Sequence, residues 1–133
     1  MDAATADVAL VTGGAQGLGA SLVRELHAAG LRVAIGDIDL AAAHALSAEI
    51  DPTGERVIAI ALDVRDKISF EQALSVLLER WGSVEILVNN AASTAARPLF
   101  DITPEEFDAV IAVNLRGTFL GSQVFGRYFK QTG

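Results

Sequence analysis

Residues 8–19 read Val-Ala-Leu-Val-Thr-Gly-Gly-Ala-Gln-Gly-Leu-Gly, an apolar run that leads straight into a glycine-rich loop. A helical pattern follows the loop. At a strand-to-helix junction such a loop holds a dinucleotide pyrophosphate, because the helix N-terminus presents free N–H groups. We assign Gly13 to the tight turn, Gly17 to close approach of the phosphates, and Gly19 to close packing of helix on sheet. Glycines often only mark turns, so the surrounding sequence decides the interpretation.

The composition predicts one globular domain that spans residues 1–133. About half of the residues (51%) are apolar and 20% are charged, which is typical of a folded chain. The net charge of −7, without a basic cluster, excludes nucleic acid and an anionic membrane as expected partners. Local N–H groups can still bind a single nucleotide in an acidic protein.

The same sequence lacks several other signals. The longest apolar run, residues 57–62, is too short to span a bilayer, and residues 1–7 do not resemble a signal peptide. The chain has no cysteine, and its two histidines, His27 and His44, belong to no metal-spaced cluster. We therefore expect a cytoplasmic protein without a metal site.

Short apolar runs alternate with longer segments of helical period. The runs at 8–12, 32–36, 57–62 and 84–88 are rich in β-branched residues and show little polar alternation, as expected for parallel strands buried on both faces. Helices are predicted over 17–29, 39–50 and 66–81, with Asp39 and Asp66 as N-caps and Gly30 as a C-terminal stop. A last helix starts at Thr103-Pro104 and runs towards Lys130, with a break near Asn114.

This order of elements predicts an α/β fold of the Rossmann type. Right-handed crossovers give a doubly wound parallel sheet with strand order 3-2-1-4. The strand order reverses between the first and fourth strands, and ligands of such sheets bind at that switch point, outside the carboxyl ends of the strands. The glycine loop lies there.

Acidic and amide side chains follow the other strands. Asp37 comes 18 residues after Gly19, where a carboxylate can accept hydrogen bonds from a ribose and repel a 2′-phosphate; the alternative is that Asp37 or Asp39 only caps the next helix. Because Gln16 adds no cation to the loop, Asp37 and Gln16 together favour NAD over NADP. Asp63-Val64 could bracket an adenine ring, or start an ordinary turn. Two amides at Asn89-Asn90 could tie neighbouring loops together, or simply form a turn.

Together these motifs resemble the short-chain dehydrogenase/reductase family. The resemblance rests on Thr-Gly-x-x-x-Gly-x-Gly at 12–19, Asp63-Val64, Trp-Gly-Ser-Val-Glu-Ile-Leu-Val-Asn-Asn-Ala at 81–91, and Asn114. It covers nearly the whole chain and implies NAD-dependent hydride transfer between NAD(H) and an alcohol or carbonyl substrate. The cofactor contacts expected from loop and resemblance together are Gly13, Gln16, Gly17, Leu18, Gly19, Asp37, Ile38, Asp63, Val64, Asn90 and Ala91.

The resemblance also gives roles to the two remaining asparagines. Asn89 would stabilise the central sheet. Asn114 matches the family's catalytic asparagine, which sits at a helix irregularity and holds a water in a proton relay. Asparagine is a poor residue for a helix interior, which fits a functional exception, although a local kink without function is the alternative.

The sequence departs from the family pattern in two respects. Ala92 stands where the family usually has glycine, which matters if that position needs a positive φ. No fifth strand is predicted up to Gly133. The family's catalytic serine and its Tyr-x-x-x-Lys pair would lie beyond that residue. Tyr128 and Lys130 do not replace that pair, because residues two apart on a helix point about 200° away from each other. We therefore expect the cofactor-binding half of such an enzyme, inactive by itself.

Two further readings stay open. The chain could be a nucleotide-binding or interaction module that ends at Gly133, or a methyltransferase on a similar sheet, although the loop spacing and Asn-Asn-Ala speak against the latter. The fourth strand is expected to form an uncovered edge. The final helix, with Leu115, Phe119 and Leu120 and with glycines at 117 and 121, is expected either to join a second subunit in a homo-oligomer or to pack into the core.

Overall fold

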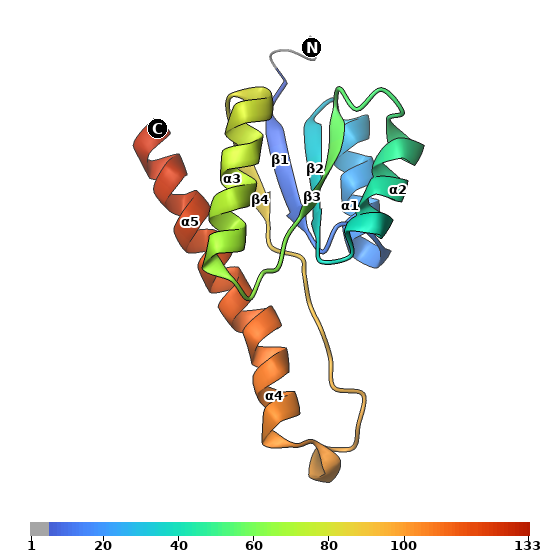
Figure 1. The fold of residues 1–133 in the computed structure, drawn as a ribbon, viewed down its shortest axis with the longest axis vertical. Coiled ribbons are helices and arrows are strands. Elements are labelled where there is room, and N and C mark those ends of the chain that lie inside the picture. Colours follow the sequence, from blue (N-terminus) through green and yellow to red (C-terminus); the bar gives the residue numbers. More distant parts are fainter. Residues whose placement is uncertain (1–5) are drawn as a thin grey trace.

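A computed structural model describes residues 6–133, and its centre is a parallel sheet of four strands in the order β3-β2-β1-β4 (Figure 1). Residues 1–5, which hold most of the segment judged unlike a signal peptide, lie outside the described residues. The predicted strand order is confirmed. Every adjacent pair is parallel, and the register aligns Leu10 with Ala34 and Leu87.

The strands and helices alternate along the chain as the sequence predicts. The strands and the first three helices are β1(Val8–Thr12), α1(Gly17–Ala28), β2(Arg32–Asp37), α2(Leu40–Ile50), β3(Val57–Ala61), α3(Lys67–Trp81) and β4(Ile86–Val88). A long extended loop then leads to η1(Leu99–Asp101), α4(Pro104–Ile111), the π-helical segment η2(Ala112–Arg116) and α5(Gly117–Thr132).

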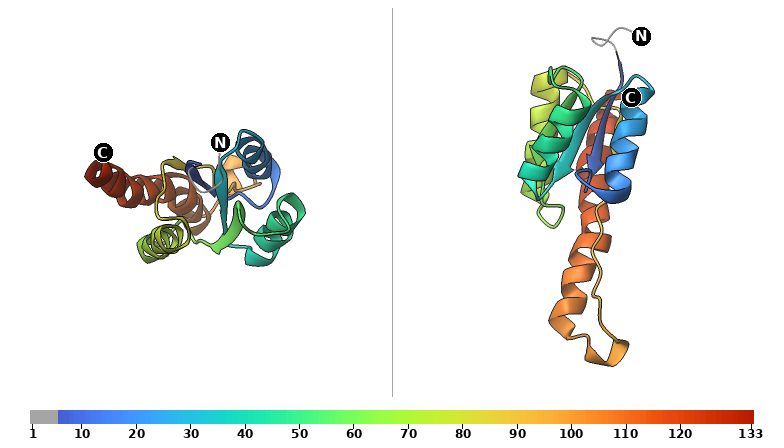
Figure 2. Two further views of the ribbon diagram at one scale, coloured as in Figure 1. Left: turned by 90° about the horizontal axis from the view of Figure 1, so that it is seen from above. Right: turned by 90° about the vertical axis from the view of Figure 1, so that its right-hand side faces the viewer.

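Each face of the sheet packs on a pair of helices (Figure 2). On one face Val23 of α1 and Leu46 of α2 join Val11 and Ile35 of the strands. The opposite core contains side chains of α3 and α5, with Phe70 and Phe125 in an edge-to-face contact at 6.3 Å between ring centroids. The residues of β1 are buried, as are those of β2 except the half-buried Asp37, whereas those of β4 are half-buried, so complete burial on both faces holds only for the central strands.

Side chains at the predicted positions cap the helices. The carboxylate of Asp39 accepts a hydrogen bond from the Ala42 N–H, and that of Asp66 accepts one from the Ile68 N–H. Thr103 and Glu106 form a reciprocal capping box at the start of α4. These local signals fix where α2, α3 and α4 start.

The last helical segment is continuous through a π-helical turn. The predicted break near Asn114 is this segment, η2, which has wider turns than an α-helix. As Figure 1 shows, α4 and the loop before it project beyond the sheet, whereas α5 runs back alongside α3. Among residues 6–133, no helix has the length and apolar character that crossing a bilayer requires.

Two of the three glycines of α5, Gly117 and Gly121, lie close to other parts of the same chain. A Cβ on Gly117 would come within 2.8 Å of Val64 Cγ2, and one on Gly121 within 2.7 Å of Asn89 Oδ1. Leu120, Val124 and Phe125 fill the core between these contacts. Core packing is therefore the role of this face of α5, while Leu115 and Phe119 remain exposed.

Candidate functional site

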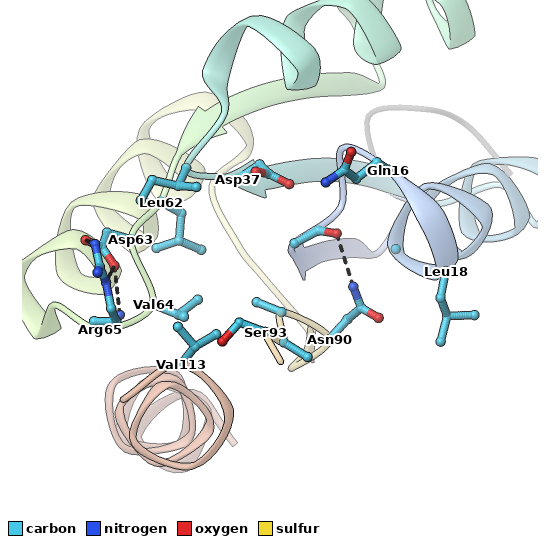
Figure 3. A pocket seen from close by; sticks show the side chains of 15 residues that line it. Gln16, Leu18, Asp37, Leu62, Asp63, Val64, Arg65, Asn90, Ser93 and Val113 are labelled. Atoms are coloured by element: carbon cyan, nitrogen blue, oxygen red, sulfur yellow. Dashed lines mark hydrogen bonds and ion pairs between the residues drawn. The ribbon is translucent and has the colours of Figure 1, made fainter. Parts of the chain in front are cut away.

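A cavity of about 590 Å³ opens at the carboxyl ends of the strands (Figure 3). It lies at the predicted switch point, where β1 and β4 are neighbours and the chain direction of the crossovers reverses. Its lining consists of Gly13, Gln16, Leu18, Gly19, Asp37, Ile38, Leu62, Asp63, Val64, Arg65, Asn90, Ala91, Ala92, Ser93 and Val113.

The cavity brings together residues that the sequence separates by up to 100 positions, from Gly13 to Val113. Every expected cofactor contact except Gly17 lines it. Gly17 opens α1 beside the cavity with a φ of 58° and with no heavy atom near the position of a Cβ. Asn114 does not line the cavity, but its neighbour Val113 does.

Two loop glycines are required by close contacts. Gly13 has a φ of 63°, and a Cβ there would come within 2.8 Å of the Ala91 Cα. At Gly19 a Cβ would collide with the carbonyl oxygen of Gly13 and lie 2.6 Å from Asn90 Nδ2. A side chain at either position would push the loop away from β4. Glycine at both positions therefore lets the loop lie against the end of β4. This explains the tight turn and the close packing expected of Gly13 and Gly19.

Asn90 holds the glycine loop against β4. Its Nδ2 donates hydrogen bonds to the carbonyl oxygens of Thr12 at 3.0 Å and Gly13 at 3.1 Å. The expected tie between neighbouring loops is therefore made by this amide. The preceding residue, Asn89, donates from Nδ2 to Ser122 Oγ at 3.3 Å, and this hydrogen bond joins the end of β4 to α5.

Thr12 is a second link between β1 and β4, and the sequence motif gave it no such role. Its buried hydroxyl donates to the Val88 carbonyl at 3.3 Å and accepts from the backbone N–H groups of Asn90 and Ala91, both at 3.0 Å. One hydroxyl thus satisfies two strand-end donors. The signal in the sequence was only a β-branched polar residue at the end of a buried strand.

Asp37 is anchored at the end of β2 and contributes to the cavity wall. Its Oδ2 accepts from the Ala15 N–H at 3.1 Å, and its Oδ1 accepts from the Asp39 N–H at 2.9 Å. The helix cap itself is Asp39, so capping does not account for Asp37. Each oxygen of Asp37 keeps acceptor capacity for a further donor in the cavity.

Asp63 forms a bidentate ion pair with Arg65 at the end of β3 (Figure 3). Arg65 Nε donates to Oδ1 at 2.9 Å, and Nη2 donates to Oδ2 at 2.8 Å. The side-chain hydrogen bond from Arg65 is the main cause that holds the pKa of Asp63 below its ordinary value. The acid is therefore ionised at neutral pH.

Asn114 holds the backbone of Ser93, which lines the cavity. Its Oδ1 accepts from the Ser93 N–H at 2.7 Å, and its Nδ2 donates to the Ser93 carbonyl at 2.9 Å. It lies within the π-helical segment, a kind of irregular turn that often occurs at functional sites. Ala92, the departure from the family's glycine, has no positive φ, so alanine fits this position without strain.

Five lining residues were not among the expected contacts. Leu62, Arg65, Ala92, Ser93 and Val113 complete the wall of the cavity. Leu62, Arg65 and Ala92 flank predicted motifs, and adjacency at a strand end could have suggested them. Ser93 and Val113 line the same cavity, and Asn114, next to Val113, accepts a hydrogen bond from Ser93 across 21 residues, for which the sequence carries no local signal.

Proteins of known description match this chain over most of its length. The family model described as short chain dehydrogenase matches residues 7–133. Sorbitol dehydrogenase of Cereibacter sphaeroides is 45% identical over 119 residues, which is 90% of this chain and 45% of that protein. L-2,3-butanediol dehydrogenase of Corynebacterium glutamicum is 34% identical over 129 residues, or 95% of this chain and 50% of that protein.

Solved structures agree with the sequence relatives. A 3-ketoacyl-(acyl-carrier-protein) reductase from Brucella melitensis, complexed with NADH, superimposes with a TM-score of 0.86 at 32% identity, and the match covers 94% of this chain and 51% of that one. The chain spans about half the length of the curated relatives it matches. These matches exclude the methyltransferase alternative. The chain belongs to the short-chain dehydrogenase family.

Proposed function

We propose that this chain is the NAD-binding half of a dehydrogenase that transfers hydride between NAD(H) and an alcohol or carbonyl substrate. The observation that carries the choice of NAD is Asp37, whose carboxylate is held in the cavity wall by the Ala15 and Asp39 N–H groups. A fixed carboxylate accepts ribose hydroxyl donors and repels a 2′-phosphate. Arg65, the cation among the lining residues, is paired with Asp63.

The residues of the cavity fit a dinucleotide. The glycine loop brings the start of α1 and its free N–H groups to one side of the cavity, which suits a pyrophosphate. Asp63 and Val64 line the part of the cavity that we propose for the adenine, and Asn90 and Ala91 line the part beside the loop. When bound, the nicotinamide ring supplies the hydride chemistry.

Asn114 is proposed as a positioning group of the catalytic machinery. Its side chain holds Ser93 through two hydrogen bonds, and its place in η2 leaves the backbone irregular at that point. This fits a family role in which the asparagine region holds a water for proton transfer.

We further propose that residues 1–133 bind cofactor but perform no turnover by themselves. Tyr128 packs against Phe129 on α5, with ring centroids 6.0 Å apart, and lines a different groove between α3 and α5. It is therefore not placed to donate a proton in the cavity. Alcohol-dependent production of NADH by the pure chain would overturn this proposal.

Calorimetric titration of the folded chain with NADH and NADPH tests the choice of cofactor. We expect NADH to bind with at least about tenfold higher affinity, corresponding to about 1.4 kcal/mol. Circular dichroism with a cooperative melt establishes that the sample is folded. Absence of NADH binding at millimolar concentration by such a sample would refute the cofactor proposal, and stronger binding of NADPH would refute the role of Asp37.

A further inference from the structure

Arg65 is the one arginine among the residues that line the cavity, and its guanidinium forms an ion pair with the carboxylate of Asp63, which also lines the cavity. Arg65 and Asp63 are two residues apart in the turn between β3 and α3. Three donors of Arg65 reach Asp63: the backbone N–H and Nε at Oδ1, at 3.0 and 2.9 Å, and Nη2 at Oδ2, at 2.8 Å. A planar guanidinium matched to both oxygens restricts rotation of the carboxylate.

The backbone of this turn is fixed independently of the ion pair. The Asp63 N–H donates to Ser69 Oγ at 2.9 Å, and the Asp66 N–H donates to the Asp63 carbonyl at 3.1 Å. Asp66 in turn caps α3. Loss of the Arg65 side chain should therefore leave the turn in place, with the residue-65 N–H still at Oδ1, and free Oδ2 of Asp63 from its donor.

The ion pair leaves Asp63 with a single free acceptor position. A carboxylate has about four lone-pair sites, and Arg65 occupies two on Oδ1 and one on Oδ2. The remaining site is on Oδ2, on a residue that lines the cavity. A single fixed acceptor selects a ligand edge with an N–H donor and disfavours one with a carbonyl oxygen.

We propose that Arg65 is a positioning residue for base selection: it fixes Asp63 so that Oδ2 accepts a hydrogen bond from the exocyclic amino group of adenine. The inference rests on the proposed function, since it needs the adenine of the cofactor beside Asp63. Adenine carries an amino donor at its 6-position, whereas hypoxanthine carries a carbonyl oxygen there, an acceptor whose partial negative charge would face the carboxylate.

The role of Arg65 is distinct from a simple positive charge near the cofactor. A charge would change the affinities for NADH and for its hypoxanthine analogue by the same factor, because both carry the same pyrophosphate. A fixed orientation of Asp63 changes the ratio of the two affinities. Lysine at this position keeps the charge but cannot hold both oxygens through a planar fork.

The test is calorimetric titration of the folded chain with NADH and with reduced nicotinamide hypoxanthine dinucleotide. We expect the parent to prefer NADH by about tenfold, and Arg65→Ala and Arg65→Lys each to reduce that ratio to about threefold or less. Asp63→Asn should bring the ratio close to one, since an amide can present either a donor or an acceptor. Arg24→Ala is the matched control, because it removes an exposed arginine–glutamate pair outside the cavity, and it should leave the ratio unchanged.

The outcomes separate this inference from the proposed function. If the folded parent does not bind NADH, the proposed function itself is wrong. If NADH binds but the parent shows no preference over the hypoxanthine analogue, or if both Arg65 variants retain the parent's ratio, the positioning role is overturned. Retention of the ratio by Arg65→Lys alone would show that charge suffices and would equally overturn the orientation argument.

Discussion

At the scale of single residues, Thr12 connects the glycine loop to β4 through one buried hydroxyl that serves two backbone donors. Thr12→Val keeps the shape but leaves the Ala91 N–H without this acceptor and the Asn90 N–H with the Val88 carbonyl alone. We expect a loss of about 2 kcal/mol in the free energy of unfolding and weaker NADH binding. Thr12→Ser keeps the hydroxyl and should cost less than about 1 kcal/mol. Urea unfolding measures both variants, and equal losses for valine and serine would contradict the assigned role.

Asp37 allows a second test at the same scale. Asp37→Asn can still accept the Ala15 N–H but loses the charge that repels a 2′-phosphate. We expect NADH affinity to fall by about tenfold and the preference of NADH over NADPH to shrink towards one. Asp39→Asn is the matched control, since asparagine is also a good helix cap and Asp39 is not among the lining residues. An unchanged NADH/NADPH ratio in Asp37→Asn would argue against its role in cofactor choice.

At the scale of elements, the turn from α2 to β3 is organised by Asp51. Its carboxylate accepts from Thr53 Oγ1 at 2.6 Å, Thr53 N–H at 3.1 Å, Arg56 N–H at 2.8 Å and Val57 N–H at 3.3 Å. The Thr53 hydroxyl is the largest cause that lowers the pKa of Asp51. A lowered pKa in the folded state means that the stabilisation is complete above the pKa of the unfolded chain, about 3.9, and is lost as the pH falls through the lower folded value.

Asp51→Asn should therefore destabilise the chain in a pH-dependent way. We expect a loss of about 1 kcal/mol in the free energy of unfolding at pH 7, after allowance for solvent screening. The difference from the parent should diminish as the pH falls below about 4, where Asp51 of the unfolded parent takes up a proton, and should vanish once the pH passes the lower pKa of the folded state. Thermal unfolding from pH 3 to 7 tests this, with the exposed Asp108→Asn on α4 as control. A difference that stays constant over this range would exclude ionisation as the source.

The elements themselves were predictable because their signals are local. Asp39, Asp66 and Thr103 cap helices within three residues of their own positions, and Gly13 meets the demand of a tight turn. The site was predictable where it follows strand ends, since parallel strands bring those ends to one edge. Its remaining parts were not predictable. The contact of Asn114 with Ser93 depends on the path of a long loop, and the ion pair of Arg65 depends on the rotamer of a flexible side chain.

At the scale of the whole molecule, the structure leaves one apolar surface uncovered on its last helical segment. Phe107, Ile111, Leu115 and Phe119 recur every fourth residue along α4, η2 and α5, and their exposed fractions are 59%, 37%, 65% and 58%. Residues spaced by four lie on one side of a helix. The core-facing side of α5 is already filled by Leu120 and Phe125, so this stripe is a separate surface.

We expect this stripe to support self-association of the chain through its last helices. Exposed apolar stripes of this kind mark interaction surfaces more often than isolated apolar residues do. Phe119→Ser should raise the dissociation constant of the oligomer by at least about tenfold, which corresponds to about 1.4 kcal/mol. Thr118→Ser, at the neighbouring exposed position, keeps its hydrogen bond to the Asn114 carbonyl and should have no effect. Sedimentation equilibrium of the parent and both variants decides the question: a monomeric parent, or equal association of all three proteins, would show that the stripe does not join two copies.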